Sequence, residues 1–291
     1  QRLSRGLGDV YKRQPKDHAD ASLVGRMWNP NVAGPSLVCI RDSEFIDITS
    51  ADAPTMRDLL ERDDPAGFVR DRDGVSLGTV EDIASNSVNH RGDTGRLHML
   101  APVDLQAVKA CGVTFAQSII ERVIEEKAKG DASQAEAIRV RCVDILGSSL
   151  KSVKAGSPEA QKVKQALIEA GMWSQYLEVG IGPDAEVFTK AQPMSSVGWG
   201  ADVGLHPVSE WNNPEPEIVL AVNSLGAVKG ATLGNDVNLR DVEGRSALLL
   251  GKAKDNNASS AIGPFIRLFD DGYGIDDVRR GELELEVTGE D

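Results

Sequence analysis

The chain has 291 residues, of which 41% are hydrophobic and 26% charged, a globular composition long enough for one large domain or two ordinary ones. No apolar run approaches the roughly 18–20 residues of a membrane-spanning helix, so we expect no membrane association. The formal net charge of −13 argues against a nucleic-acid partner, because phosphate contacts need a basic surface.

The N-terminal third predicts a small α+β domain over residues 15–100. Residues 1–14 are set aside, because "GDVYKRQ" resembles the translated end of a transposon adaptor used in sequencing libraries. After them, short apolar runs such as "SLVCI" and "EFIDIT" alternate with polar turns. The stretch "SADAPTMRDLLER" predicts one helix, with Asp52 or Ser50 as its N-cap and Pro54 in its first turn.

Residues 101–291 predict a second domain, which opens with three helices. "FAQSIIERVIEEKAKG" has an apolar stripe at helical spacing and stops at Gly130, and "DASQAEAIRVRCVDILG" follows it. In "SPEAQKVKQALIEAG", Ser157 is the expected N-cap, Pro158 stands at the first helical position and Gly171 lies just past the end. We expect these three helices to form an insertion ahead of the strands that follow residue 180.

Short strands separated by glycine-rich turns follow residue 180, as in "PEIVLAVNSLGAVKGATLGNDV". The last stretch, "GELELEVTGED", alternates Leu283, Leu285 and Val287, which predicts a half-buried strand. The chain stops in what would be the next turn, so we expect a truncated domain whose return strands are missing.

The cysteine pattern favours a reducing compartment. Cys39, Cys111 and Cys142 are odd in number and lack CxxC spacing, so we expect reduced, buried thiols and a cytoplasmic location.

Two glutamates stand at the head of the β-branched run "PEPEIVLAVN". Side chains two apart on a strand share a face, so Glu215 and Glu217 lie side by side. Asp236 ends the next strand of an apparent hairpin, where it could join them. Three hard oxygen ligands suit Mg²⁺, Mn²⁺ or Ca²⁺ rather than zinc, but a solvated acidic hairpin is an equally simple interpretation of the spacing.

The combination "PEPEIVLAVN…GATLGNDVNLRD…AKDNNASSAIGP" closely resembles the catalytic core of the fumarylacetoacetate hydrolase superfamily. The resemblance implies a mixed β-roll with a helical insertion, in which Glu215, Glu217 and Asp236 hold a divalent cation. It also implies that Lys190 of "FTKAQP", Lys254 of "GKAKDNNASSAIGP" and Arg240 of the "RD" pair bind the substrate, with the two lysines taking part in catalysis. A homodimer is implied as well. The overall expectation is an α+β protein with this catalytic domain over residues 101–291.

One element of the superfamily is altered in this chain. Its hydrolases and decarboxylases carry Asn-Tyr-x-x-His-x-x-Glu on a helix, but the corresponding stretch here is "GVTFAQSIIE", with Ser118 in the place of the histidine and Glu121 retained. Serine cannot activate water unaided, which argues against hydrolysis. Glu121 could still remove a proton α to a carbonyl if burial raises its pKa. Glu121 is otherwise one of several solvated glutamates.

The segment "GVTFAQSIIE" and the N-terminal "ASLVGRMWNP…GPSLVCIRD" together resemble the 2-keto-3-deoxy-sugar-acid dehydratase branch of the superfamily. That resemblance implies metal-dependent loss of water from a 2-keto-3-deoxypentonate, a small 2-oxo acid, to give 2,5-dioxopentanoate. The alternatives are hydrolysis or decarboxylation of an acylpyruvate- or oxaloacetate-type acid on the same scaffold, or a metal-binding fragment without catalysis.

Overall fold

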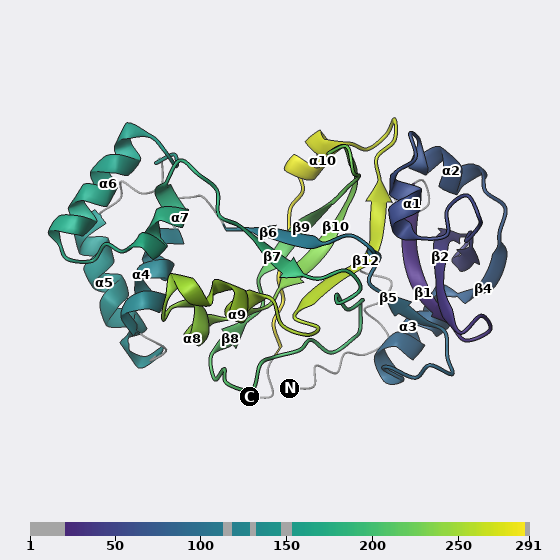
Figure 1. The fold of residues 1–291 in the computed structure, drawn as a ribbon, viewed down its shortest axis with the longest axis horizontal. Coiled ribbons are helices and arrows are strands. Elements are labelled where there is room, and N and C mark those ends of the chain that lie inside the picture. The colour runs from purple at the N-terminus through teal and green to yellow at the C-terminus, as the bar shows by residue number, and fades with distance from the viewer. Residues whose placement is uncertain (1–20, 113–117, 129–131, 147–152, 289–291) are drawn as a thin grey trace.

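The computed structural model of the protein describes residues 21–112, 118–128, 132–146 and 153–288. Figure 1 shows three parts side by side: a helical lobe, a central set of strands, and the N-terminal strands with their helices. The expected adaptor-derived segment, residues 1–14, lies outside the described residues. The expected α+β class is confirmed.

An eight-stranded antiparallel sheet runs through the N-terminal and central parts. Its order is β4-β3-β2-β1-β12-β10-β9, with β5 pairing on β1. Because β1 pairs with β12, with Leu23 opposite Arg267, the sheet crosses the expected domain boundary at residue 100, and that boundary stays a prediction. The strands are β1 Leu23–Asn29, β2 Gly34–Arg41, β3 Glu44–Asp47, β4 Val75–Thr79, β5 His98–Leu100, β9 Pro216–Val222, β10 Val228–Asp236 and β12 Ser260–Leu268.

Helices cover both faces of the N-terminal strands. Successive side chains of a strand point to opposite faces, and Val24 accordingly packs with α1 and α2 while Met27 packs with α3. The helices are α1 Met56–Leu60, α2 Pro65–Asp71 and α3 Val80–Asn89. The helix expected in this region forms as α1, but Thr55 caps it by accepting from the backbone of Asp58, in place of Asp52 or Ser50. Thr55 wins because it directly precedes the first helical residue.

The helical lobe has its own apolar core and confirms the three helices expected there. It contains α4 Ser118–Ala128, α5 Ala135–Leu146, α6 Pro158–Glu169 and α7 Glu178–Ile181, with 3₁₀ turns at Ala132–Gln134 and Gln175–Leu177. Ser157 caps α6 and Pro158 opens it, as predicted. Ile119 and Val123 of α4 pack against Leu167 of α6 in the core of the lobe. In Figure 1 this lobe lies beside α8 and α9.

Short elements connect the lobe to the central strands. They are β6 Val108–Cys111, β7 Val187–Ala191, β8 Asn212–Asn213, β11 Asn238–Leu239, α8 Arg240–Glu243 and α9 Leu250–Lys254, with a 3₁₀ turn at Ala247–Leu249. Helix α10 Ile275–Arg279 lies apart from them and contacts β10. β6 pairs with β7, and β8 with β11. Leu239, Val242 and Ala253 form a small core that joins β11, α8 and α9. This core fixes the chain immediately after Asp236.

Two expectations about local structure are wrong. Residues 281–288 form no strand, and Leu283, Leu285 and Val287 are exposed. Alternation alone does not make a strand, because the backbone also needs a neighbouring strand to bond, and this segment is not part of any sheet among the described residues. The cysteines are free as expected, but Cys111 is exposed while Cys39 and Cys142 are buried. Over its described residues the protein has no helix long and apolar enough to cross a membrane.

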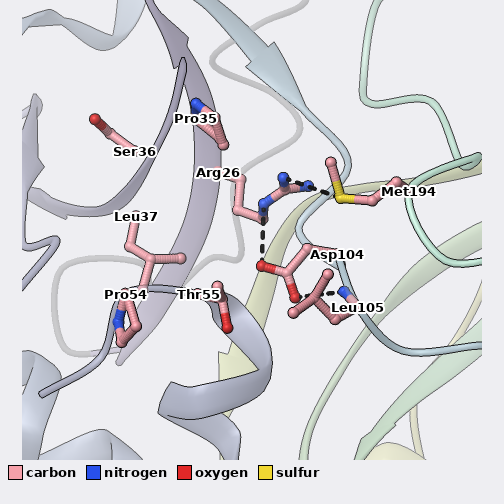
Figure 2. A pocket seen from close by; sticks show the side chains of 9 residues that line it. All are labelled: Arg26, Pro35, Ser36, Leu37, Pro54, Thr55, Asp104, Leu105 and Met194. Atoms are coloured by element: carbon pink, nitrogen blue, oxygen red, sulfur yellow. Dashed lines mark hydrogen bonds and ion pairs between the residues drawn. The ribbon is translucent and has the colours of Figure 1, made fainter. Parts of the chain in front are cut away.

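A buried ion pair ties the N-terminal strands to the loop that follows β5. Arg26 Nε lies 3.4 Å from Asp104 Oδ2, with both side chains about 5% exposed. The Arg26 guanidinium also donates to the carbonyls of Ala101 and Val103. Asp104 accepts from the backbone of Met56 at the start of α1. A 190 Å³ cavity opens beside this pair (Figure 2), bordered also by Met194.

Loss of Asp104 leaves the buried Arg26 charge without its partner and the first amides of α1 without an acceptor. We expect Asp104→Ala to lower the free energy of unfolding by about 3–5 kcal/mol, as for other broken buried pairs. The control is Asp202→Ala, because the Arg91–Asp202 pair is largely exposed and the expected loss is under about 1 kcal/mol. Urea denaturation measures both, and equal losses would contradict this account.

Candidate functional site

The β9–β10 hairpin brings the three predicted acidic ligands together. Glu217 pairs with Gly234, and the amide of Asp236 donates to the carbonyl of Glu215 at 2.9 Å. Glu215 and Glu217 therefore share one face of the hairpin, with Asp236 directly across from Glu215. Asp236 is buried, whereas Glu215 and Glu217 keep part of their side chains in solvent. The carboxylate cluster therefore has a buried end at Asp236 and a partly exposed end at Glu215 and Glu217.

Both predicted lysines reach this carboxylate cluster from distant parts of the chain. Lys254, at the end of α9, places Nζ 2.5 Å from Glu215 Oε2 and 3.2 Å from Asp236 Oδ2. Lys190, on β7, places Nζ 2.9 Å from Asp236 Oδ1. The two ammonium groups thus contact different oxygens of Asp236, Lys190 contacting Oδ1 and Lys254 contacting Oδ2.

The two lysines differ in their remaining contacts. Lys190 is 1% exposed and also donates to the carbonyls of Val237 and Lys254, so protein acceptors satisfy its three protons. This geometry fits an internal counter-ion better than a group in direct contact with substrate. Lys254 has Phe188 beside it, with Nζ 5.4 Å from the ring centroid. Its two hydrogen bonds go to carboxylates of the cluster.

Burial and like charge act strongly on Glu217. Desolvation, together with the negative charges of Asp236 and Glu215, raises the pKa of Glu217 to about 7. Among the described residues its carboxylate makes no hydrogen bond or ion pair that would offset this cost. Burial would lower the pKa of Lys254, but the surrounding carboxylates outweigh it, and the pKa lies above its ordinary value. For Lys190 burial prevails and lowers the pKa.

Sequence reasoning missed three polar residues around the carboxylate cluster. The buried amide of Asn238 donates to Glu215 and to Glu243 of α8. Glu243 is buried as well. Glu186, just before β7, is half-buried, and burial raises its pKa while Arg122 of α4 opposes the rise. None of the three belongs to a periodic pattern or a spacing motif, so no signal in the single sequence marked them.

The other predicted site residues, Ser118, Glu121 and Arg240, lie on helices α4 and α8. Glu121 lies on α4 with its side chain 48% exposed, and both of its oxygens accept from Arg139 of α5 at 3.0 and 3.1 Å. Burial, on which its proposed role as a base depended, is therefore not observed. Ser118 begins α4, and the side chain of Ser118 lies outside what the structure describes, as do Thr114 and Phe115. Arg240 is the first residue of α8, and its guanidinium carbon lies 5.7 Å from the centroid of the Trp211 ring.

The carboxylate cluster fits a divalent cation by charge and by ligand type. Four carboxylates, those of Glu215, Glu217, Asp236 and Glu243, face two ammonium groups, which leaves two negative charges when all are ionised. Carboxylate oxygens are the donors that Mg²⁺, Mn²⁺ and Ca²⁺ prefer. In the described part of the chain no three such side chains are arranged as ligands, because Lys254 Nζ lies between Glu215 and Asp236.

Comparisons with known proteins give a consistent result. No family model matches the chain. It is 29% identical over 254 residues to the "Probable 2-keto-3-deoxyxylonate dehydratase" of Haloferax volcanii, covering 87% of this chain and 68% of that protein. Over 81 residues it is 38% identical to the 2-dehydro-3-deoxy-D-arabinonate dehydratase of Saccharolobus solfataricus, which is 28% of this chain and 27% of that protein. The resemblance predicted from the motifs is confirmed.

Solved structures extend the likeness to the fold. A 2-keto-3-deoxy-D-arabinonate dehydratase complexed with magnesium and 2,5-dioxopentanoate matches with a TM-score of 0.52 and 21% identity, over 84% of this chain and 65% of that one. The apo form matches with a TM-score of 0.53 and 20% identity, over 84% and 66%. The chain has the fold of these dehydratases and spans about two thirds of their length.

The raised pKa of Glu217 has a consequence for stability. Because the folded-state pKa of about 7 exceeds the ordinary value of 4.5, the folded protein binds the extra proton, so stability is full below about pH 4.5 and declines as pH rises through 7. In EDTA we expect Glu217→Gln to remove this decline and to gain about 1–2 kcal/mol over the parent between pH 5 and pH 8, allowing for solvent screening. Urea unfolding of both proteins at pH 5 and at pH 8 measures this difference in the free energy of unfolding. Parallel pH profiles would contradict the assignment.

Proposed function

We propose that the protein is a metal-dependent dehydratase of a 2-keto-3-deoxy sugar acid, a small 2-oxo acid with a hydroxyl at C4. The observation that supports this most directly is the convergence of Glu215, Glu217 and Asp236 with two lysines. It occurs on a fold shared with dehydratases that act on such acids. We further propose 2,5-dioxopentanoate, named in one neighbour's complex, as the product from a pentonate.

In this proposal each group of the site has a separate task. Glu215, Glu217 and Asp236 hold Mg²⁺, Mn²⁺ or Ca²⁺ and neutralise it. The ion, when bound, supplies Lewis-acid stabilisation of charge that develops on the 2-oxo group. Lys190 keeps Asp236 in place through their ion pair. Lys254 offers an ammonium group to the substrate carboxylate, and Arg240 is proposed as a second cation that binds the substrate.

The reaction requires one proton to be removed and one hydroxyl to leave. A base takes a proton from C3, the electron pair forms the C3–C4 double bond, and the C4 hydroxyl departs with a proton as water. Moving a proton from C5 to C3 then shifts the double bond to C4–C5 and gives an enol. Loss of the C5 hydroxyl proton and protonation of C4 convert this enol to the aldehyde. We propose Glu121 as this base, with Ser118 on the same helix α4. Because Glu121 is paired with Arg139 and is not buried, the role requires the bound substrate to displace that ion pair. Glu186 is a second candidate, since it is half-buried and its charge interacts with that of Lys254.

Product identity tests the proposed function against its alternatives. With Mg²⁺ present, we expect 2,5-dioxopentanoate from a 2-keto-3-deoxypentonate. This product is detected by derivatising its aldehyde group. Pyruvate from an acylpyruvate or oxaloacetate would instead support hydrolysis or decarboxylation. No product from any of these substrates, together with retained Mg²⁺ binding, would identify a metal-binding chain without catalysis.

Glu217→Ala should abolish Mg²⁺ binding in calorimetry, because it removes one of three ligands.

Paired substitutions decide which carboxylate is the base. We expect Glu121→Gln to lower kcat by about 10²–10⁴-fold, the contribution of a general base, while leaving Mg²⁺ affinity unchanged. Glu186→Gln is the matched comparison, because it makes the same replacement closer to Lys254. Full activity in Glu121→Gln with loss in Glu186→Gln would transfer the role to Glu186. Loss in neither would remove both from the mechanism.

A further inference from the structure

Asn238 occupies an unusual position between two carboxylates. It lies on β11, two residues after Asp236, and is 1% exposed. Its Nδ2 donates to Glu215 Oε1 at 3.0 Å and to Glu243 Oε2 at 2.5 Å. The reversed amide would turn its oxygen towards two carboxylates, so the contacts themselves fix which end carries the protons. The two protons of one nitrogen are thus shared between a proposed ligand and a residue of α8.

Glu243 is held firmly at the other end of this bridge. It is the last residue of α8, and its side chain is buried. The small core of Leu239, Val242 and Ala253 fixes the helix from one side. Asp241, on the same helix, accepts from the Ser209 hydroxyl and the Glu210 amide and so ties α8 to the loop before β8. Because its helix is anchored twice, Glu243 can hold the amide of Asn238 in one orientation.

The bridge determines how Glu215 presents its oxygens. With Oε1 bound to Asn238, Oε2 is the atom turned towards Lys254 and Asp236. A carboxylate held in this way loses less side-chain freedom when it takes up an ion than one that rotates freely. Its neighbour Glu217 has no such bond among the described residues, so the two proposed glutamate ligands are unequally prepared.

We propose that Asn238 and Glu243 form a positioning pair that orients Glu215 for a divalent cation, with Glu243 acting through Asn238 and not on the ion itself. This rests on the proposed metal site and adds two residues to it. Partners that orient a metal ligand in this way commonly contribute 10–100-fold to metal affinity. A fourth carboxylate can be buried beside three others because Glu243 accepts the hydrogen bond from Asn238 and its charge is attracted by the ammonium group of Lys254.

Metal affinity is the measurement that isolates this role. Mn²⁺ binding to the full chain, followed by the EPR signal of the free ion, requires no turnover. We expect Asn238→Ala and Glu243→Ala each to weaken binding 10–100-fold. Glu243→Gln should stay within about threefold of the parent, because the glutamine oxygen still accepts from Asn238 Nδ2. Asp241→Asn is the control on α8, and it should lower the unfolding midpoint while leaving affinity within about threefold.

The outcomes separate this inference from the proposed function. If the parent chain binds no Mn²⁺, the metal site itself is overturned. If the parent binds and Asn238→Ala binds equally well, only the positioning pair is overturned. Glu243→Gln as weak as Glu243→Ala would show that charge, and not the hydrogen bond, matters, which also contradicts the proposal. Should Asn238→Ala not fold, Glu243→Ala against Glu243→Gln carries the same test from α8.

Discussion

The concentration of like charge at the end of the β9–β10 hairpin is the constraint on which the rest of the site depends. Burying carboxylates together is costly unless cations and hydrogen-bond donors compensate them. The protein meets this cost from three directions: Lys190 on β7, Lys254 on α9 and Asn238 on β11. Three of the short elements around the hairpin thus each bring one compensating group to it. The carboxylate cluster organises this region together with the small apolar core of Leu239, Val242 and Ala253.

The acidic part of the site could be predicted because it is local. Strand periodicity puts Glu215 and Glu217 on one face, and hairpin pairing brings Asp236 opposite, over a separation of only about twenty residues. The lysines are different. Nothing in spacing or propensity connects Lys190 to residues 64 positions away at Lys254, and only the resemblance to a superfamily placed them together. Asn238 and Glu243 lie on elements of two and four residues, too short to leave a periodic signal.

The same distinction holds for the fold. Helices α4, α5 and α6 were predicted from patterns within each segment, and the Ser157 cap acts within one turn. The sheet depends on partners far apart in the chain, such as β1 and β12, which no window of sequence contains. Residues 281–288 show the error in the other direction, since their alternation is that of a strand but they join none of the described sheets. Local patterns specify helices and caps, whereas pairing decides strands.

The two lysines respond differently to the charge of the site. Lys190 is bonded to the carbonyls of Val237 and Lys254 as well as to Asp236, so two of its acceptors are backbone groups whose charge does not change with pH. Lys254 donates to Glu215 and Asp236, and its side chain therefore follows their charge. Because Lys190 bonds to the backbone of Lys254 and not to its side chain, movement of the Lys254 ammonium leaves Lys190 in place. The site thus combines a cation held largely by backbone carbonyls with one held by the carboxylates of Glu215 and Asp236.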